Sequence, residues 1–315
     1  MNAGRSLREA LEDYLTLRRA LGFKLHTVAR LLGQFVDYLC ERDMPAPTIE
    51  IALIWAMLPV DSSPQWRAIR LSAVRGFATY LHAIDAHVEV PPTALIRSGP
   101  CRVTPYLYSE TEIAALLSAA GGLRPRLRAS TYQVLIGLLA VTGLRIGEAI
   151  GADTIDLDVE HHMLVVRHAK FDTSRLVPLH PSTLAALSDY LLLRDRSRAT
   201  LASSALLVST RGTRLLHSNV SLTFSRLAHQ VGITRRSASC RPRIHDLRHS
   251  FAVATVLDWY REGLDVAAMM PRLSTYLGHT DPKHTYWYLE AAPELMALAG
   301  QRLDTHQGAL RKEQR

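Results

Sequence analysis

The stretch Arg243-Ile244-His245-Asp246-Leu247-Arg248-His249 carries two phosphate-binding side chains, those of His245 and Arg248, three residues apart. Residues at that spacing share one face of a helix. Downstream the chain reads Leu277-Gly278-His279, and Tyr288 follows nine residues after that histidine. Imidazole, guanidinium and phenol groups in this order indicate a site for phosphate chemistry.

A second arginine motif lies far upstream, in Thr142-Gly143-Leu144-Arg145-Ile146-Gly147-Glu148-Ala149. Two guanidinium groups hold a pentavalent phosphorus better than one, so we expect the chain to fold Arg145 back onto Arg248. Two interpretations of Glu148 stay open. It is either an ordinary helix partner of Arg145, which is worth a few tenths of a kcal/mol, or a carboxylate that aims the arginine or a neighbouring histidine.

The motifs resemble those of the tyrosine recombinase (phage integrase) family in their order along the chain, which is Arg145, Lys170, His245, Arg248, His279 and Tyr288. The resemblance runs from about Ser109 to the C-terminus, and more loosely over the first hundred residues. Around Lys170 the segment is similar to the family's hairpin, with Arg175 and Val-Pro-Leu in register. Both hairpin glycines and its second lysine are replaced here, so the turn is expected to differ in shape.

The resemblance implies a mainly α fold with a small β-hairpin or sheet, in two domains. The expected domains are a helical N-terminal core DNA-binding domain at 1–87, a linker at 88–108 and a mostly helical catalytic domain at 109–315. Composition agrees, because 315 residues with 48% hydrophobic content can bury a sizeable core.

The resemblance also implies a site-specific recombinase or integrase that needs no metal and no cofactor. The implied roles are phosphate binding by Arg145 and Arg248, protonation of the departing 5′-oxygen by Lys170, proton transfer by His245, a hydrogen bond to the phosphate from His279, and a 3′-phosphotyrosyl link to Tyr288. The implied partners are double-stranded DNA with an inverted-repeat-like core site and three further copies of the chain, which together form a tetramer of two dimers around a Holliday junction. A sister recombinase as an additional partner stays an open alternative. The biological setting is also open between transposition by a mobile element, phage or integron integration, and dimer resolution.

The net charge of +8 and the pI of about 9.6 favour a polyanionic partner. Cys40, Cys101 and Cys240 are widely spaced and odd in number, which excludes a disulfide framework and a zinc pattern and fits a reducing compartment. The longest apolar run, 134–141, is far shorter than the ~20 residues that a membrane span needs. With no signal-peptide core near the N-terminus, we expect a cytoplasmic, nucleoid-associated protein without a membrane partner.

Apolar periodicity and capping signals predict helices over 5–21, 27–42, 48–57, 63–84, 131–141, 181–194 and 218–230. Ser63-Pro64 is typical of a helix start, and Ser109-x-x-Glu112 is a capping box. Two β-rich runs, 163–166 and 176–179, read as a hairpin.

Six arginines are candidates for DNA contacts: Arg67, Arg70, Arg75, Arg175, Arg241 and Arg243. The first three share one predicted helix. They form either a solvated helix face, which is the usual fate of such charges, or a face that lies on DNA phosphates.

Two other functions compete. One is a metal-dependent hydrolase that uses His245 and His249, although the zinc-protease motif has glutamate where this chain has Asp246 and no third ligand is placed. The other is a non-catalytic DNA-binding protein of the same fold.

The tyrosine nearest to the predicted nucleophile, Tyr286, is expected to pack in the core, because an aromatic residue at helical spacing usually does.

Overall fold

The structure is a computed structural model that describes residues 6–97, 104–167, 174–197, 203–279, 281 and 285–286 of the chain. The chain divides into two compact units, Met1–Arg102 and Val103–Arg315. The division falls inside 88–108, where the sequence suggests a linker. The described residues are mainly helical and form one small antiparallel sheet, as predicted.

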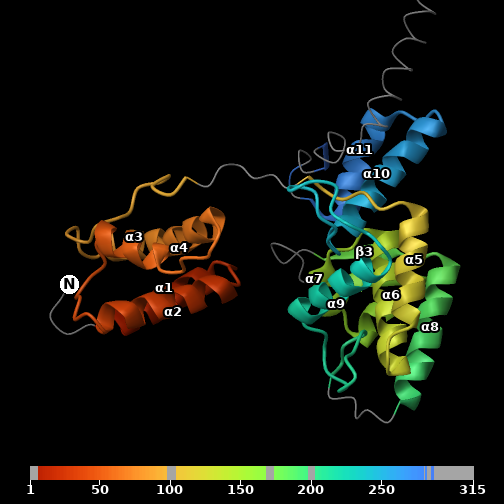
Figure 1. The fold of residues 1–315 in the computed structure, drawn as a ribbon, viewed down its shortest axis with the longest axis horizontal. Coiled ribbons are helices and arrows are strands. Elements are labelled where there is room, and N and C mark those ends of the chain that lie inside the picture. Colours follow the sequence, from red (N-terminus) through yellow and green to blue (C-terminus); the bar gives the residue numbers. More distant parts are fainter. Residues whose placement is uncertain are drawn as a thin grey trace, which may run out of the picture. The chain divides into compact units, whose positions relative to one another are not determined.

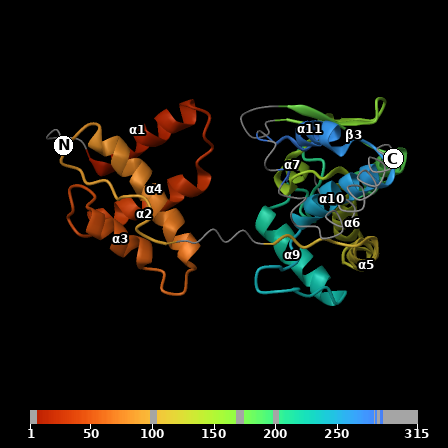
Figure 2. The ribbon, with the colours of Figure 1, turned by 90° about the horizontal axis from the view of Figure 1, so that it is seen from above.

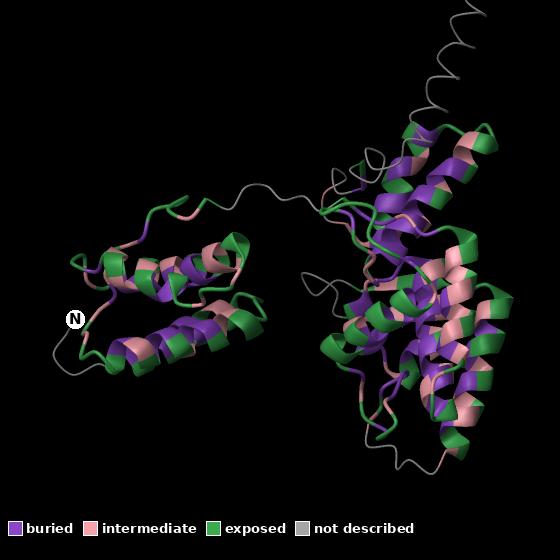
Figure 3. Cartoon of the chain, viewed as in Figure 1, coloured by how far each residue is buried: buried purple, intermediate pink, exposed green. Residues whose placement is uncertain are grey.

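The described residues of the N-terminal unit form four helices: α1 (Leu7–Ala20), α2 (His26–Cys40), α3 (Ile49–Met57) and α4 (Pro64–His82). Its core lies between α2 and α4, where Leu31, Phe35, Val74 and Phe77 are fully buried. Figure 3 shows this buried stripe along the inner faces of the helices.

Helix α4 begins where the sequence predicts. The Ser63 side chain accepts a hydrogen bond from the Trp66 backbone N–H at 3.2 Å, and Pro64 occupies the first turn. A hydroxyl at this position satisfies one of the backbone donors that a helix start leaves unpaired.

The interpretation of Arg70 as part of an exposed arginine face is wrong. Arg70 is 8% exposed. Its guanidinium carbon lies 3.6 Å from the centre of the Trp55 ring, and Nη2 donates to the Trp55 carbonyl at 2.8 Å. Stacking on the Trp55 ring and the bond to its carbonyl offset part of the cost of burying this charge, so Arg70 joins α4 to α3.

The C-terminal unit contains α5 (Glu110–Gly121), α6 (Arg126–Thr142), α7 (Ile146–Gly151), the 3-10 helix η1 (Thr154–Asp156), β1 (Leu157–Asp158), β2 (Met163–Val166), β3 (Arg175–Pro178), α8 (Pro181–Arg196), α9 (His217–Gln230), α10 (Asp246–Arg261) and α11 (Val266–Leu277). The central helix is α6, which packs against α5, α8 and α10 (Figure 1). The capping box of Ser109 and Glu112 is present as predicted.

The sheet has the order β1-β2-β3 and is antiparallel throughout. The predicted hairpin is confirmed in β2 and β3, where Val166 pairs with Arg175 and Leu164 with Val177. Side chains alternate across a strand, so Arg175 shares a face with the buried Val177, while Leu176 is 61% exposed on the other face.

Two left-handed glycines end the helices that bound the site. Gly143 (φ 60°) follows α6, and Gly278 (φ 68°) follows α11. A Cβ at Gly143 would lie 2.4 Å from a ring carbon of Phe251, so this turn requires glycine on conformational and steric grounds. Figure 2 shows α11 beside β3. Within the described ranges, every helix is too short or too polar to span a bilayer.

Candidate active site

Arg145 directly precedes α7, where its position is fixed by Glu148. The Arg145 backbone N–H donates to Glu148 Oε2 at 2.9 Å, and Nη1 of its side chain donates to Oε1 at 2.8 Å. A carboxylate at the third helical position commonly binds the first backbone donor in this way. The Arg145 side chain is 30% exposed, so its guanidinium is anchored and still reaches solvent.

The Glu148 carboxylate also receives a two-pronged ion pair from Arg175. Nη1 of Arg175 donates to Oε1 at 3.0 Å, and Nη2 donates to Oε2 at 2.7 Å. Burial by itself raises the pKa of Glu148, but the hydrogen bonds and charge of Arg175, followed by those of Arg145, lower it to about 2. Glu148 is therefore ionised at neutral pH, and the interpretation of this carboxylate as one that aims Arg145 fits its contacts.

The C-terminal end of α11 accepts hydrogen bonds from three arginines. Arg175 Nε donates to the carbonyl of Tyr276 at 2.9 Å. Arg248 Nη2 and Arg145 Nη2 donate to the next two carbonyls, those of residues 277 and 278, at 2.6 and 2.8 Å. The last carbonyls of a helix lack partners within it and carry partial negative charge. Three cations, from the residue before α7, from β3 and from α10, thus meet at one helix end, and the prediction that Arg145 and Arg248 come together is confirmed.

Arg248 lies at the bottom of this cluster and is 1% exposed. Besides the α11 carbonyl, it donates to the carbonyl of Gly143 at 2.7 Å and to Nε2 of His279 at 2.8 Å. One guanidinium thereby joins the ends of α6 and α11, which a planar fork with five N–H donors allows.

The tautomer of His279 follows from these contacts. A guanidinium cannot accept a hydrogen bond, so Nε2 accepts from Arg248 and carries no proton. Nδ1 then holds the proton and donates to Oγ1 of Thr285 at 2.7 Å. Thr285 is 1% exposed and was not predicted as a site residue; its one signal in the sequence is its place three residues before Tyr288.

His245 is the residue before α10 and is exposed at the surface of the cluster. Partial desolvation and then the charges of Arg248, Arg243 and Arg145 lower its pKa to about 4. Its imidazole is therefore neutral at pH 7 and able to accept a proton. The centres of the His245 and His249 rings are 5.2 Å apart, and the two ring planes are perpendicular. Burial lowers the pKa of His249 to about 3.

Most of the predicted DNA-contact arginines bind groups within the protein. Arg243 is paired with the buried carboxylate of Asp246 at 2.7 Å. Arg67 donates to the carbonyl of Val60, and Arg75 to that of Pro91 at 2.7 Å. Arg175 and Arg70 are bound as described above, whereas Arg241 is exposed.

Two predicted site residues, Lys170 and Tyr288, lie outside the described residues. The expectation that Tyr286 packs in the core is wrong, because its side chain is 47% exposed. In the part of the chain that the structure describes, His, Cys, Asp and Glu side chains form no group of three or more that could hold a metal ion. His245 and His249 thus gain no third ligand there.

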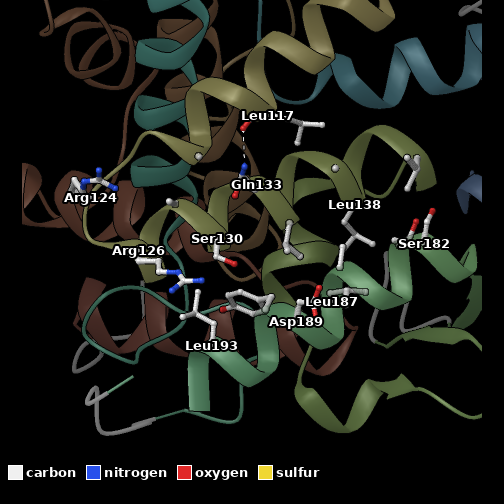
Figure 4. Close-up of a pocket in the computed structure, with 18 residues that line it drawn as sticks. Leu117, Arg124, Arg126, Ser130, Gln133, Leu138, Ser182, Leu187, Asp189 and Leu193 are labelled. Carbon is white, nitrogen blue, oxygen red and sulfur yellow. Dashed lines mark hydrogen bonds between the residues drawn. The ribbon is translucent and has the colours of Figure 1, made fainter. Parts of the chain in front are cut away.

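A cavity of about 760 Å³ lies between α5, α6 and α8. Figure 4 shows its lining, with the hydrogen bond from Gln133 to the carbonyl of Leu117 between α5 and α6. The predicted site residues that the structure describes do not line it.

Comparison with known proteins identifies the chain's relatives. The sequence model of the phage integrase family matches residues 108–294. The "Putative integrase/recombinase y4rB" of Sinorhizobium fredii strain NGR234 is 43% identical over 305 residues, which cover 95% of this chain and 97% of that protein. Tyrosine recombinase XerC of Myxococcus xanthus is 28% identical over 307 residues, covering 92% of this chain and 95% of XerC.

Solved structures share the fold. XerH site-specific recombinase, bound to palindromic difH substrate in a post-cleavage complex, aligns with a TM-score of 0.62 at 17% identity, over 94% of this chain and 84% of XerH. The Tn1549 transposon integrase in complex with transposon right-end DNA aligns with a TM-score of 0.61 at 17% identity, over 93% of this chain and 98% of the integrase.

Proposed function

The chain belongs to the phage integrase family and is a tyrosine site-specific recombinase; on that premise we propose that it cleaves and rejoins DNA through a phosphotyrosyl link to Tyr288. The observation that carries the proposal is the convergence of Arg145 and Arg248 on adjacent carbonyls at the end of α11. Guanidinium groups keep their protons and offer paired donors. They suit the charge that grows on the non-bridging oxygens of a phosphate in the transition state.

Each step of the reaction needs two proton transfers, one from the attacking hydroxyl and one to the departing oxygen. The phenol oxygen of Tyr288 attacks phosphorus, and its proton passes to a base, for which the candidate is His245, because its imidazole is neutral and lies exposed at the surface of the cluster. The bond from phosphorus to the 5′-oxygen breaks, and Lys170 supplies the proton that this oxygen takes up. A free 5′-hydroxyl of a partner strand then attacks the phosphotyrosyl ester and gives its proton back to Lys170, while the departing phenol oxygen of Tyr288 takes the proton back from His245. The ester conserves the bond energy and makes ATP unnecessary. Neither step calls for a metal or a cofactor.

The role of His279 requires a change of hydrogen bonding. Its Nε2 now accepts from Arg248, so it gives a hydrogen bond to a phosphate only after Arg248 has turned to the phosphate and Nε2 has gained a proton. Thr285, on the other side of the ring, holds the imidazole in place.

The proposed partner is double-stranded DNA with an inverted-repeat-like core site. Residues 1–87 are proposed to bind the core site and 109–315 to carry out cleavage, with four copies acting as two dimers on a Holliday junction at the nucleoid. The net charge of +8 and the DNA-bound states of the XerH and Tn1549 neighbours support a DNA partner. We favour a mobile-element setting, in which either one recombinase or a sister pair acts.

The test is whether the chain forms a covalent adduct with nicked duplexes. Their sequences together cover the DNA that flanks the native gene. The wild-type chain is expected to leave a protein–DNA adduct that survives denaturation, and EDTA should not prevent it. Tyr288→Phe should abolish the adduct, whereas Tyr286→Phe, a change of the same kind two residues away, should leave it. Loss of the adduct in Tyr286→Phe, with retention in Tyr288→Phe, would show that Tyr286 is the nucleophile and would refute the role proposed for Tyr288. Specific binding without any adduct would favour the non-catalytic alternative.

A further inference from the structure

Arg175 joins three elements of the C-terminal unit that are far apart in the chain. It is the first residue of β3, its fork binds Glu148 in α7, and its Nε donates to Tyr276 in α11. Its side chain is 14% exposed, about half the value for Arg145. A guanidinium whose three nitrogens all donate within the protein is poorly placed to bind a phosphate.

We propose that Arg175 is a positioning residue that holds Arg145 through Glu148, and that it is not a DNA contact. This inference rests on the proposed function, because Arg145 is the group being positioned for a phosphate. Arg145 and Arg175 share Oε1 of Glu148, at 2.8 and 3.0 Å. The Arg175 fork occupies both carboxylate oxygens and so fixes the plane of the carboxylate.

Removing the Arg175 fork should loosen Arg145. The last torsion of a glutamate side chain has a broad distribution and little intrinsic preference. Without Arg175, Glu148 loses two of its four hydrogen bonds and can turn Oε1 away from Arg145. A displacement of about 1 Å at a reacting centre can cost about 10²-fold in rate.

Gly278 gives independent support for close positioning of the two arginines. A Cβ there would lie 2.9 Å from Nη1 and 3.2 Å from Cζ of Arg175, and 3.5 Å from Nη1 of Arg145. The backbone at Gly278 must therefore stay bare for the Arg175 guanidinium to reach the end of α11, whereas the distance to Arg145 is an ordinary van der Waals contact. Its φ of 68° also disfavours any side chain.

Two simpler roles for Arg175 make different predictions. As a DNA contact, it would contribute one phosphate interaction, so its loss would weaken binding and reduce the salt slope by about 0.9. As a purely structural arginine, its loss would destabilise the unit and leave the chemistry of the folded molecules unchanged. As a positioning residue, it should affect the cleavage rate at saturating DNA and leave the affinity unchanged.

The test compares full-length variants on the nicked duplex that gives an adduct with the wild type. Arg175→Lys keeps the charge and removes the fork. It is expected to slow single-turnover adduct formation about 10²-fold at saturating DNA. Arg175→Met, which removes the charge as well, should also slow it and should leave the DNA Kd and its salt slope as in the wild type. The matched control is Arg194→Lys, since the Arg194 side chain is also buried in the same unit (7% exposed) and binds Thr154, Ala205 and Leu206. This control should cleave at the wild-type rate.

Two further measurements complete the design. In a double-mutant cycle, Arg175→Lys should add less than about twofold in a Glu148→Gln background, because both changes release the same carboxylate. Gly278→Ala displaces the Arg175 guanidinium while Arg175 keeps its charge, so this variant should slow cleavage in the same way. It replaces Arg175→Lys in the test if Arg175→Lys does not fold.

Four results would overturn the inference. They are a wild-type cleavage rate in Arg175→Lys, a reduced salt slope with an unchanged saturating rate in Arg175→Met, an equal loss of rate in Arg194→Lys, and additive effects of Arg175→Lys and Glu148→Gln. Failure of the wild-type chain to form any adduct would instead refute the proposed function, and the inference with it.

Discussion

Replacing Glu148 by glutamine is expected to lower the free energy of unfolding of the C-terminal unit by about 3 kcal/mol at pH 7. The side chain of Glu148 is 9% exposed and accepts four hydrogen bonds from Arg145 and Arg175. The fall of its pKa from 4.5 to about 2 corresponds to roughly 3 kcal/mol, at about 1.4 kcal/mol per pH unit. Glutamine removes the charge and turns one accepting oxygen into a donor that faces a guanidinium.

The pH dependence of this difference has a definite sign. Above pH 4.5, Glu148 is ionised in both the folded and the unfolded chain, so the advantage of glutamate is constant there. As the pH falls from 4.5 towards 2, the unfolded chain binds the proton before the folded one does, and the advantage is lost. The stability difference between wild type and Glu148→Gln should therefore narrow in that window.

Urea unfolding of the full-length chain, followed by circular dichroism at pH 7, 4.5 and 3, measures this difference. Glu160→Gln, at an exposed position in the turn before β2, should stay within about 0.5 kcal/mol of the wild type. A loss below about 1 kcal/mol for Glu148→Gln at pH 7, or a loss that is the same at pH 7 and pH 3, would refute the account of Glu148 as the shared anchor of two arginines.

Three other changes have expected outcomes. Arg248→Met should destabilise the C-terminal unit by about 3–5 kcal/mol in urea unfolding, because buried acceptors including the Gly143 carbonyl lose their donor; wild-type stability would contradict this. His249→Asn should flatten the acid destabilisation between pH 6.5 and about 3, where the unfolded chain binds a proton that the buried imidazole refuses; a pH profile like that of the wild type would refute the assigned burial effect. Arg70→Met should cost the N-terminal unit about 1–3 kcal/mol by leaving the Trp55 carbonyl unpaired, and should leave the salt slope of DNA binding unchanged; a smaller slope would restore Arg70 as a DNA contact.

Local signals carried most of the sequence predictions that the structure bears out. Ser63-Pro64 and the pair Ser109 and Glu112 start helices at the predicted positions, because each cap is completed within four residues. The hairpin of β2 and β3 was found for the same reason, since β-rich residues in both runs lie close together in the chain.

Whether an arginine is buried or exposed depends on contacts between distant segments, and the sequence predictions of DNA-contact arginines did not account for these contacts. The sequence alone places Arg70 on either a solvated helix face or a face that lies on DNA phosphates. However, Arg70, Val74 and Phe77 follow Trp66 by four, eight and eleven residues and so share its side of the helix. Both Val74 and Phe77 are fully buried, so the 3.6-residue period could have placed Arg70 inward.

For Arg175 a similar signal was present in the strand period. It is two residues from Val177 in β3, and residues at that spacing point to the same face. Val177 is 1% exposed, so the alternation predicts an inward arginine. No local pattern, however, reveals that its partners are Glu148 and the carbonyl of Tyr276, because these come from α7 and α11.

The three arginines at the end of α11 differ in their exposed fractions, and this difference indicates different roles in the proposed chemistry. Arg145 is 30% exposed, Arg175 14% and Arg248 1%. In the described part of the chain, Arg145 and Arg175 carry two positive charges against the single negative charge of Glu148, and this excess favours an incoming phosphate. Arg145 is the cation that solvent reaches, so a phosphate meets it first. Arg248 is buried and donates to two carbonyls and to His279, so it follows Arg145 in the order in which a phosphate meets these cations.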